Sequence, residues 1–192
     1  MSAHLCPALR RGAAGDWPGG WTGDEVGGME SFRGRYTNRI DAKGRVSVPA
    51  KFRAITIGQG YNGIVCFPSL KGASVIEGCG PEFSNLIDEM LAQLAPFSDE
   101  REELAMVLHG NAWELMFDAD GRVVLPEELR ERAGITGDVT FVGMGQRFQI
   151  WEPKAYEAHY EQVMKKVGSL SDLLKPPAQM ARERSGNDGG AS

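Results

Sequence analysis

The sequence predicts an α+β fold in which two similar halves close one pseudo-two-fold β-barrel, with helices at its periphery. The main observation is an internal repeat: residues 41–53 read DAKGRVSVPAKFR, and residues 118–130 read DADGRVVLPEELR. Aligned without a gap, seven of these thirteen positions are identical, which indicates a duplicated unit,. Each half carries too few apolar residues for a core of its own, so we expect the halves to share one.

Each copy of the repeat predicts a tight turn between two strands. An Asp that opens a turn, with a Gly three residues later, favours a type I turn in which Gly44 or Gly121 is left-handed. Asp41 then lies across the hairpin from Arg45, close enough to pair with it, and Asp118 is related to Arg122 in the same way. These two aspartates and two glycines are therefore expected to set the shape of the turns.

A proline follows each repeat strand and suits the first turn of a helix. The predicted helices run from Pro49 to about Ile57 and from Pro126 to about Ala133. Gly134 is a plausible C-terminal stop for the second helix.

The remaining pattern places the same elements in both halves, which we delimit as residues 29–110 and 111–175. Strands are expected at 32–40, 64–67, 74–77, 112–117, 139–142 and 147–151, with further helices at 82–96, at 98–110 and from residue 153. Residues 78–81 are expected to break the strand pattern. The apolar faces at 83–94 and 156–167 either cover the barrel or contact other subunits, and covering the barrel is favoured for most of these residues.

The two ends of the chain have the composition of disordered segments. Residues 1–28 contain seven glycines and no hydrophobic period, which predicts a disordered leader, with Met29 as a possible alternative start,. Residues 176–192 are polar and small, and we expect a disordered tail there. The start lacks the hydrophobic region of a secretory signal.

Charge is unevenly distributed over the chain, whose net charge is −5. Residues 33–53 contain seven basic side chains against the single acid Asp41, whereas residues 114–132 contain three basic and six acidic ones. An anionic partner would therefore be attracted mainly by the first copy. Three scattered cysteines without a CxxC pair fit a reduced cytosolic setting and no zinc site, and no apolar run is long enough to span a membrane.

The paired D-x-x-x-R segments, Asp41 to Arg45 and Asp118 to Arg122, resemble the MraZ family, as do residues 32–34 (FRG) and the following R-V-x-x-P run. The resemblance covers about residues 29–170. It implies a swapped-hairpin barrel of the AbrB superfamily and a cytoplasmic, nucleoid-associated transcriptional regulator, usually a repressor of the division and cell-wall gene cluster. Such proteins assemble as rings and bind G-rich direct repeats of double-stranded DNA in their own promoter. No enzyme activity, cofactor, metal or small-molecule substrate is implied.

The candidate DNA contacts are basic residues at and before the turns. Arg45 is placed to donate a forked pair of hydrogen bonds to guanine, and Asp41 to orient it. Phosphate contacts are expected from Lys43, Arg33, Arg35 and Arg39. Arg122 is a weaker candidate because Asp120 replaces Lys43 in its copy. The alternative is that Arg45 and Arg122 merely pair with their own aspartates, and Arg53 and Arg130 are expected to be solvated or to form stabilising salt bridges.

Other classes of function remain open from sequence alone. An antitoxin-like member of the same superfamily would carry a toxin-binding segment, but such chains usually have a single hairpin copy. An enzyme could use Asp41 and Asp118 as paired carboxylates, although each has an arginine four residues on that would keep it ionised. A passive oligomeric scaffold would show no salt-dependent DNA binding.

Overall fold

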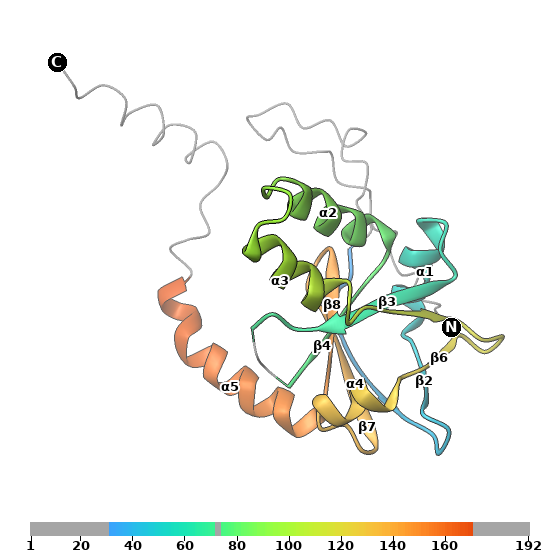
Figure 1. The fold of residues 1–192 in the computed structure, drawn as a ribbon. Helices are drawn as coiled ribbons and strands as arrows, with labels where there is room; N and C mark the ends of the chain where they lie inside the picture. The colour runs from blue at the N-terminus through green and yellow to red at the C-terminus, as the bar shows by residue number, and fades with distance from the viewer. Residues whose placement is uncertain (1–30, 72–73, 171–192) are drawn as a thin grey trace, which may run out of the picture. The chain divides into compact units, whose positions relative to one another are not determined.

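The computed structural model describes residues 31–71 and 74–170, and the predicted disordered segments at 1–28 and 176–192 lie outside these residues (Figure 1). The first half contains β1 (Arg35–Arg39), β2 (Arg45–Ser47), α1 (Ala50–Gly58), β3 (Gly63–Pro68), β4 (Ile76–Cys79), α2 (Pro81–Ala92) and α3 (Asp99–Leu108). The second half contains β5 (Trp113–Met116), β6 (Arg122–Val124), α4 (Glu127–Arg132), β7 (Asp138–Gly143), β8 (Arg147–Trp151) and α5 (Pro153–Leu170). Apart from α3, the order of elements is the same in both halves, as predicted.

The two halves exchange strands with each other. The first strand of each half pairs with the third strand of the other, β1 with β7 and β5 with β3, and all these pairs are antiparallel. The second strands, β2 and β6, pair with each other, and so do the fourth strands, β4 and β8. The result is a six-stranded sheet in the order β1-β7-β8-β4-β3-β5 and a separate two-stranded ribbon of β2 and β6.

This arrangement is the predicted α+β class, with two differences in the strands. The hydrogen bonds between the described strands leave an open sheet and a ribbon and do not close a barrel. The strands beside each turn also do not form the simple hairpin that the repeat suggested. One bond from Asp41 N to Arg45 O closes the first turn, after which β1 and β2 separate to pair with the other half.

The apolar positions of the repeat form the core between the halves. Equivalent residues of the two copies are almost completely buried: Val46 and Val123, Val48 and Leu125, Phe52 and Leu129. The ring of Phe52 lies 5.2 Å from that of Phe32 and 5.1 Å from that of Phe148, measured between centroids. Because each copy supplies half of these side chains, neither half can bury them alone.

The predicted break at residues 78–81 is wrong for two of these residues, because β4 continues through Gly78 and Cys79. Gly78 lies opposite Phe148 in the pairing of β4 with β8. A Cβ at Gly78 would lie 2.3 Å from the ring of Phe148, so the glycine makes room for a neighbouring aromatic side chain,. The glycine therefore permits close packing here and does not interrupt the strand.

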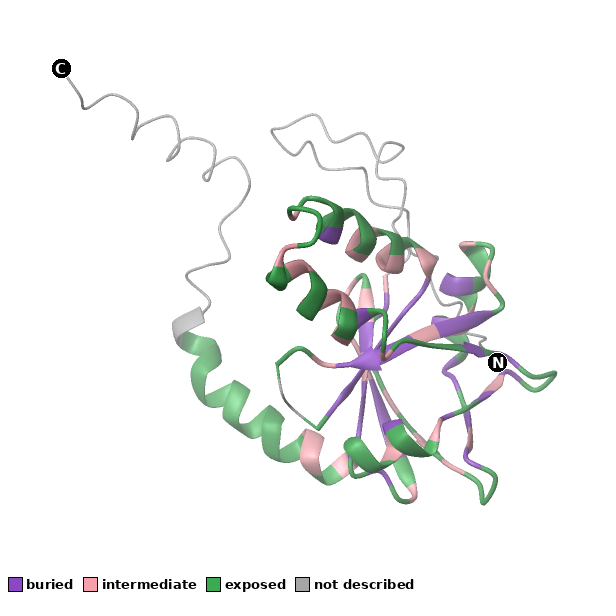
Figure 2. Cartoon of the chain, viewed as in Figure 1, coloured by how far each residue is buried: buried purple, intermediate pink, exposed green. Residues whose placement is uncertain are grey.

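A second apolar cluster lies beneath α2 and α3, which cover one face of the sheet (Figure 1). Its buried members are Phe67, Cys79, Leu91 and Leu108. In contrast, α5 is exposed along most of its length (Figure 2). The expectation that the apolar face of 156–167 mostly covers the barrel is therefore wrong. None of the described helices is long and apolar enough to cross a membrane.

Candidate nucleic-acid interface

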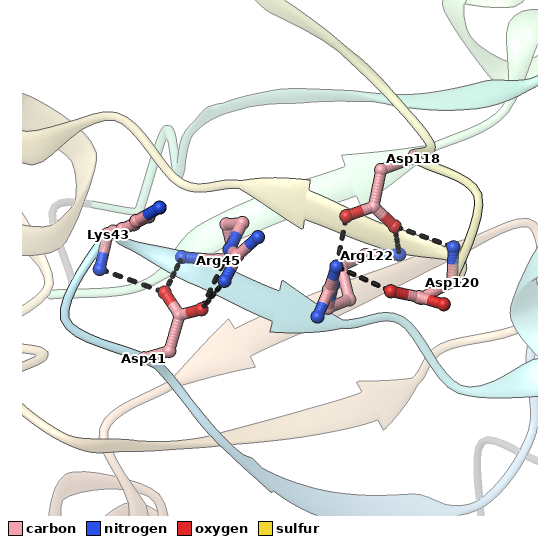
Figure 3. Close-up of polar contacts among 6 residues, drawn as sticks. All are labelled: Asp41, Lys43, Arg45, Asp118, Asp120 and Arg122. Atoms are coloured by element: carbon pink, nitrogen blue, oxygen red, sulfur yellow. Dashed lines mark hydrogen bonds and ion pairs between the residues drawn. The ribbon is translucent and has the colours of Figure 1, made fainter.

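The side chain of Asp41 braces the first repeat turn, in addition to the backbone bonds that close it (Figure 3). Its Oδ1 atom accepts hydrogen bonds from the backbone N–H groups of Lys43, at 2.9 Å, and Arg45, at 3.0 Å. Gly44 donates its N–H to the Asp41 carbonyl at 2.9 Å and has a φ of +76°, as predicted for a left-handed turn residue,. The turn therefore has a fixed shape with Lys43 at its tip.

The same carboxylate also holds the side chain of Arg45. Asp41 Oδ2 lies 2.7 Å from Arg45 Nε and 2.6 Å from Arg45 Nη2. The Arg45 side-chain hydrogen bond is the main cause that lowers the pKa of Asp41 to about 2. Among the described residues, Nη1 of Arg45 makes no hydrogen bond, and the side chain is 33% exposed. The pair thus fixes the guanidinium while leaving its outer edge open to solvent.

The second turn repeats this geometry and adds one contact. Asp118 Oδ1 accepts the N–H groups of Asp120 and Arg122, both at 2.9 Å, and Oδ2 accepts Nε of Arg122 at 2.8 Å. In addition, the Asp120 carboxylate pairs with Nη2 of Arg122 (Figure 3). The backbone N–H of Arg122 is the main cause that lowers the pKa of Asp118, and the hydrogen bond to Asp118 raises the pKa of Arg122. Arg122 is therefore held between two carboxylates, unlike Arg45.

Both arginines lie on the solvent face of the β2–β6 ribbon. Arg45 is opposite Val124, and Ser47 is opposite Arg122. The residues between them, Val46 and Val123, are buried, so the alternation of a β-strand directs the other side chains outward,. A two-stranded ribbon is one of the elements that the major groove of B-DNA, about 12 Å wide, can admit.

The half-buried side chains of Arg53 and Arg130 donate hydrogen bonds to the backbone that follows each turn. Arg53 Nη1 donates to the carbonyl of Val48, and Arg130 Nε donates to that of Leu125 at 3.1 Å. Neither forms an ion pair with a described residue, so the expected salt bridge is replaced by bonds to backbone carbonyls. A Cβ on Gly121 would meet Nε of Arg53 at 2.5 Å, which places the helix of one half beneath the turn of the other. The identity of Arg53 and Arg130 in the repeat was the available signal for this contact.

The structure brings together only some of the predicted DNA-binding residues. Arg45 and Arg122 lie on the ribbon, and Lys43 lies at the tip of the turn that leads into it. Arg39 is exposed at the nearby end of β1, opposite Asp138 in the pairing with β7.

The other two cations lie at the far end of β1, which rises about 3.3 Å per residue. Arg35 pairs with Glu157 of α5 at 2.8 Å and lies over the ring of Tyr156. Arg33 donates to the hydroxyl of Ser31 at 2.7 Å. In the described part of the chain, no group of three or more His, Cys, Asp or Glu side chains is placed to hold a metal ion.

Comparison with known proteins gives the same family as the repeat motifs. Residues 108–171 match the family model described as "MraZ protein, putative antitoxin-like". A transcriptional regulator MraZ from Parvibaculum lavamentivorans is 61% identical over 158 residues, which cover 82% of this chain and 98% of that relative. The chain belongs to the MraZ family. Further MraZ relatives come from Beijerinckia indica, 42% identical over 80% of this chain and 96% of the relative, and Methylocella silvestris, 43% identical over 76% and 88%.

Proposed function

We propose that the chain is a sequence-specific, DNA-binding transcriptional regulator. More specifically, we propose that it is a repressor of the division and cell-wall gene cluster and binds G-rich direct repeats in its own promoter. The chain acts in the cytoplasm, associated with the nucleoid, as a ring-like homo-oligomer. The names of the relatives, all transcriptional regulators, support the general class.

One observation carries the proposal: Arg45 is held by Asp41 on an exposed ribbon with its outer edge open. An arginine whose terminal nitrogens point into the major groove can donate two parallel bonds to O6 and N7 of guanine. Fixing the guanidinium in advance lowers the conformational entropy that binding would otherwise cost. This chemistry supports the G-rich target that the family resemblance implies.

The contacts around Arg45 provide affinity and register. Lys43, at the turn tip, and Arg39, at the end of β1, are exposed cations that can approach phosphates beside the groove,. Arg122 contributes less because Asp120 and Asp118 both compete with DNA for its donors. Arg33 and Arg35 are secondary candidates, since they lie away from the ribbon and Arg35 is paired with Glu157.

One such ribbon per chain gives weak binding that depends strongly on salt. A ring that presents several ribbons to neighbouring repeats raises the effective concentration of the second and later contacts. The exchange of strands between the halves supports assignment to the AbrB-like swapped-hairpin folds, in which the two tandem copies act as an internal pseudo-dimer.

The geometry disfavours an enzyme built on Asp41 and Asp118. A pair of carboxylates used for acid–base chemistry requires one of them to have a raised pKa. Here the pKa of each is lowered, chiefly by a hydrogen bond from Arg45 or from the backbone of Arg122. Both carboxylates are occupied in shaping their turns.

The test is the binding of a labelled G-rich duplex, derived from the region upstream of the gene, measured by fluorescence anisotropy over a series of salt concentrations. Arg45→Ala should weaken binding by roughly 5- to 150-fold, since a good bidentate pair contributes about 1–3 kcal/mol. Arg122→Ala is the matched control and should have a smaller effect. Equal affinity of the wild-type protein for G-rich and scrambled duplexes would contradict the proposal.

A further inference from the structure

An apolar stripe on α5 is left largely exposed by the described residues, with the ring of Tyr160 stacked on that of Tyr156 in the same helix. The stripe consists of Tyr160, Val163, Met164 and Val167, which follow the i, i+3, i+4, i+7 spacing of one helical face,. Their side chains are between 38% and 49% exposed. Figure 2 shows α5 exposed over most of its length beyond the first turn. Four adjacent large apolar side chains in water are costly, which makes this stripe a candidate contact surface.

Comparison with the equivalent helix of the first half shows which surface would cover the apolar stripe of α5. In the first half, α2 has the same place in the order of elements as α5 has in the second. The apolar face of α2 packs against the sheet and α3, where Phe83 and Ile87 are partly buried and Leu91 is buried. The second half has no described counterpart of α3. The α5 stripe therefore has the character of the α2 face but lacks the surface that covers it.

A matching concave surface lies on the other helices. A cavity of about 410 Å³ opens between α2, α3 and the edge of β3 and is lined mainly by apolar side chains. We call it the α2–α3 groove and define it by Phe67, Leu70, Phe83, Met90, Leu94 and Leu104. Leu70 and Met90 are 55% and 60% exposed, so the groove is accessible from solvent. Its volume lies within the range of about 300–1,000 Å³ typical of occupied pockets.

The polar group in the wall of the groove is already satisfied. Glu77 is buried there, and its two carboxylate oxygens accept bonds from Arg147 and Gln149, both at 2.9 Å. The Arg147 guanidinium also lies over the ring of Phe83, 5.8 Å from its centroid. An apolar occupant therefore leaves neither Glu77 nor Arg147 unpaired, and Lys71, which also lines the groove, is exposed and can keep its charge in water,.

The charges of the two surfaces are complementary. Helices α2 and α3 together carry seven carboxylates and one arginine. In contrast, α5 carries three lysines and two glutamates. Opposite net charges favour an encounter between α5 and the α2–α3 hairpin over contact between two α5 helices or between two hairpins.

We propose that the α5 stripe of one copy docks into the α2–α3 groove of a second copy of this chain. The inference rests on the ring-like assembly in the proposed function and assigns the two surfaces that build it. The binding mode is a helix in a groove, with anchors at i, i+3, i+4 and i+7. Since the two surfaces differ, the contact is heterologous: every copy has one free groove and one free helix, and the assembly grows until it closes.

The test uses the full chain with three variants at exposed positions, analysed by size-exclusion chromatography with light scattering. Val163→Asp places a charge in the stripe, and Met90→Asp places one at the groove. Gln162→Asp is the matched control, because it adds the same charge on the opposite side of α5. The wild type and the control should form the same assembly, whereas the two other variants should be monomers with unchanged circular dichroism.

Mixing the two monomeric variants distinguishes this contact from a symmetric one. The Val163→Asp copy retains an intact groove, and the Met90→Asp copy retains an intact helix, so the mixture should form a one-to-one dimer and stop there. A mixture that stays monomeric overturns the proposal, as does a Met90→Asp protein that assembles like the wild type or a wild type that is itself monomeric.

A separate measurement keeps this result apart from the proposed DNA binding. The Val163→Asp monomer should bind a short duplex with one G-rich repeat as well as the wild type does, and should lose only the added affinity for several repeats. Failure of the wild type to bind the single repeat would count against the DNA-binding site, whatever the assembly results. Full multi-repeat affinity in a monomeric Val163→Asp protein would overturn the link between docking and DNA binding.

Discussion

Asp41 binds Arg45 through both the backbone N–H and the guanidinium, at 3.0 Å and 2.7 Å. One carboxylate therefore fixes the turn and the direction of the side chain at the same time. A movement of the turn would move the guanidinium with it, so the proposed recognition of guanine by Arg45 would depend on the integrity of a three-residue loop.

The acid titration of Asp41 tests this coupling. Its pKa of about 2 lies below the unfolded value of about 3.9, so its contribution to stability is fully present above that unfolded value and is lost as the pH falls through 2,. Arg45→Ala should raise the pKa of Asp41 towards its ordinary value, as followed by NMR of the carboxyl group. Arg122→Ala should raise the pKa of Asp118 less. The backbone N–H of residue 122, which is the main cause of the lowered pKa of Asp118, is retained in this variant. An unchanged Asp41 midpoint in Arg45→Ala would contradict the coupling.

Replacing Arg45 by lysine separates charge from geometry. Lysine keeps the positive charge but cannot donate two parallel bonds to guanine. Arg45→Lys should therefore lose about tenfold in affinity for G-rich DNA, within the ~1–3 kcal/mol of a bidentate pair, while its dependence on salt stays near that of the wild type. Anisotropy titrations at several salt concentrations measure both quantities. A lysine variant that discriminates G-rich from scrambled DNA as the wild type does would exclude direct guanine recognition by this residue.

Asp120→Lys should convert the second turn into a copy of the first. The substitution removes the second carboxylate from Arg122 and places a cation at the turn tip. DNA affinity should rise, and the slope of log K against log salt should steepen by about one per added phosphate contact. Lys43→Asp is the reciprocal control and should weaken binding. No change in the salt slope with Asp120→Lys would show that the second turn does not reach the phosphates.

Gly121→Ala should destabilise the fold more than Gly145→Ala. Both glycines have positive φ values, +73° and +85°, so alanine carries a backbone cost of about 1–2 kcal/mol at either position,. Only at Gly121 does the new Cβ also meet the side chain of Arg53, at 2.5 Å, whereas Gly145 has nothing within 4 Å. Denaturant unfolding of the two variants measures the difference. Equal losses of stability would mean that Arg53 moves aside freely.

The exchange of strands predicts that the halves depend on each other. Residues 29–110 alone would leave β3 without β5 and β1 without β7. Each half expressed alone should be unfolded by circular dichroism, and mixing the two should restore cooperative unfolding. A first half that folds alone to its native secondary structure would contradict a shared core.

The turns and the core positions were predictable because the same residue pattern occurs in both copies of the repeat. Gly44 and Asp41 follow from turn chemistry, and the apolar pairs such as Phe52 and Leu129 follow from the alternation around each proline. The open edge of Arg45 was not predictable, although the substitution of Lys43 by Asp120 indicated that the two turns differ.

The misses came from long-range packing. The residues leave no local signal for strand pairing between the halves, since β1 has the same sequence pattern whether it pairs with β2 or with β7. Only the family resemblance, through its swapped hairpins, implied an exchange. Gly78 has the composition of a strand break, and only the position of Phe148 explains it. The helical period of α5 correctly located its apolar face but did not show that the face is left uncovered by the described residues.

Joining both turns in one chain has a consequence for the direction in which DNA is read. A single-copy protein that pairs with itself must present identical turns, and its symmetry is matched by palindromic operators. Here Lys43 stands at one tip and Asp120 at the other, so the internal two-fold relation is broken where the tips would approach the DNA backbone. The two ends of the internal pseudo-dimer therefore differ, and in the proposed DNA complex this polarity would favour sites that all point the same way.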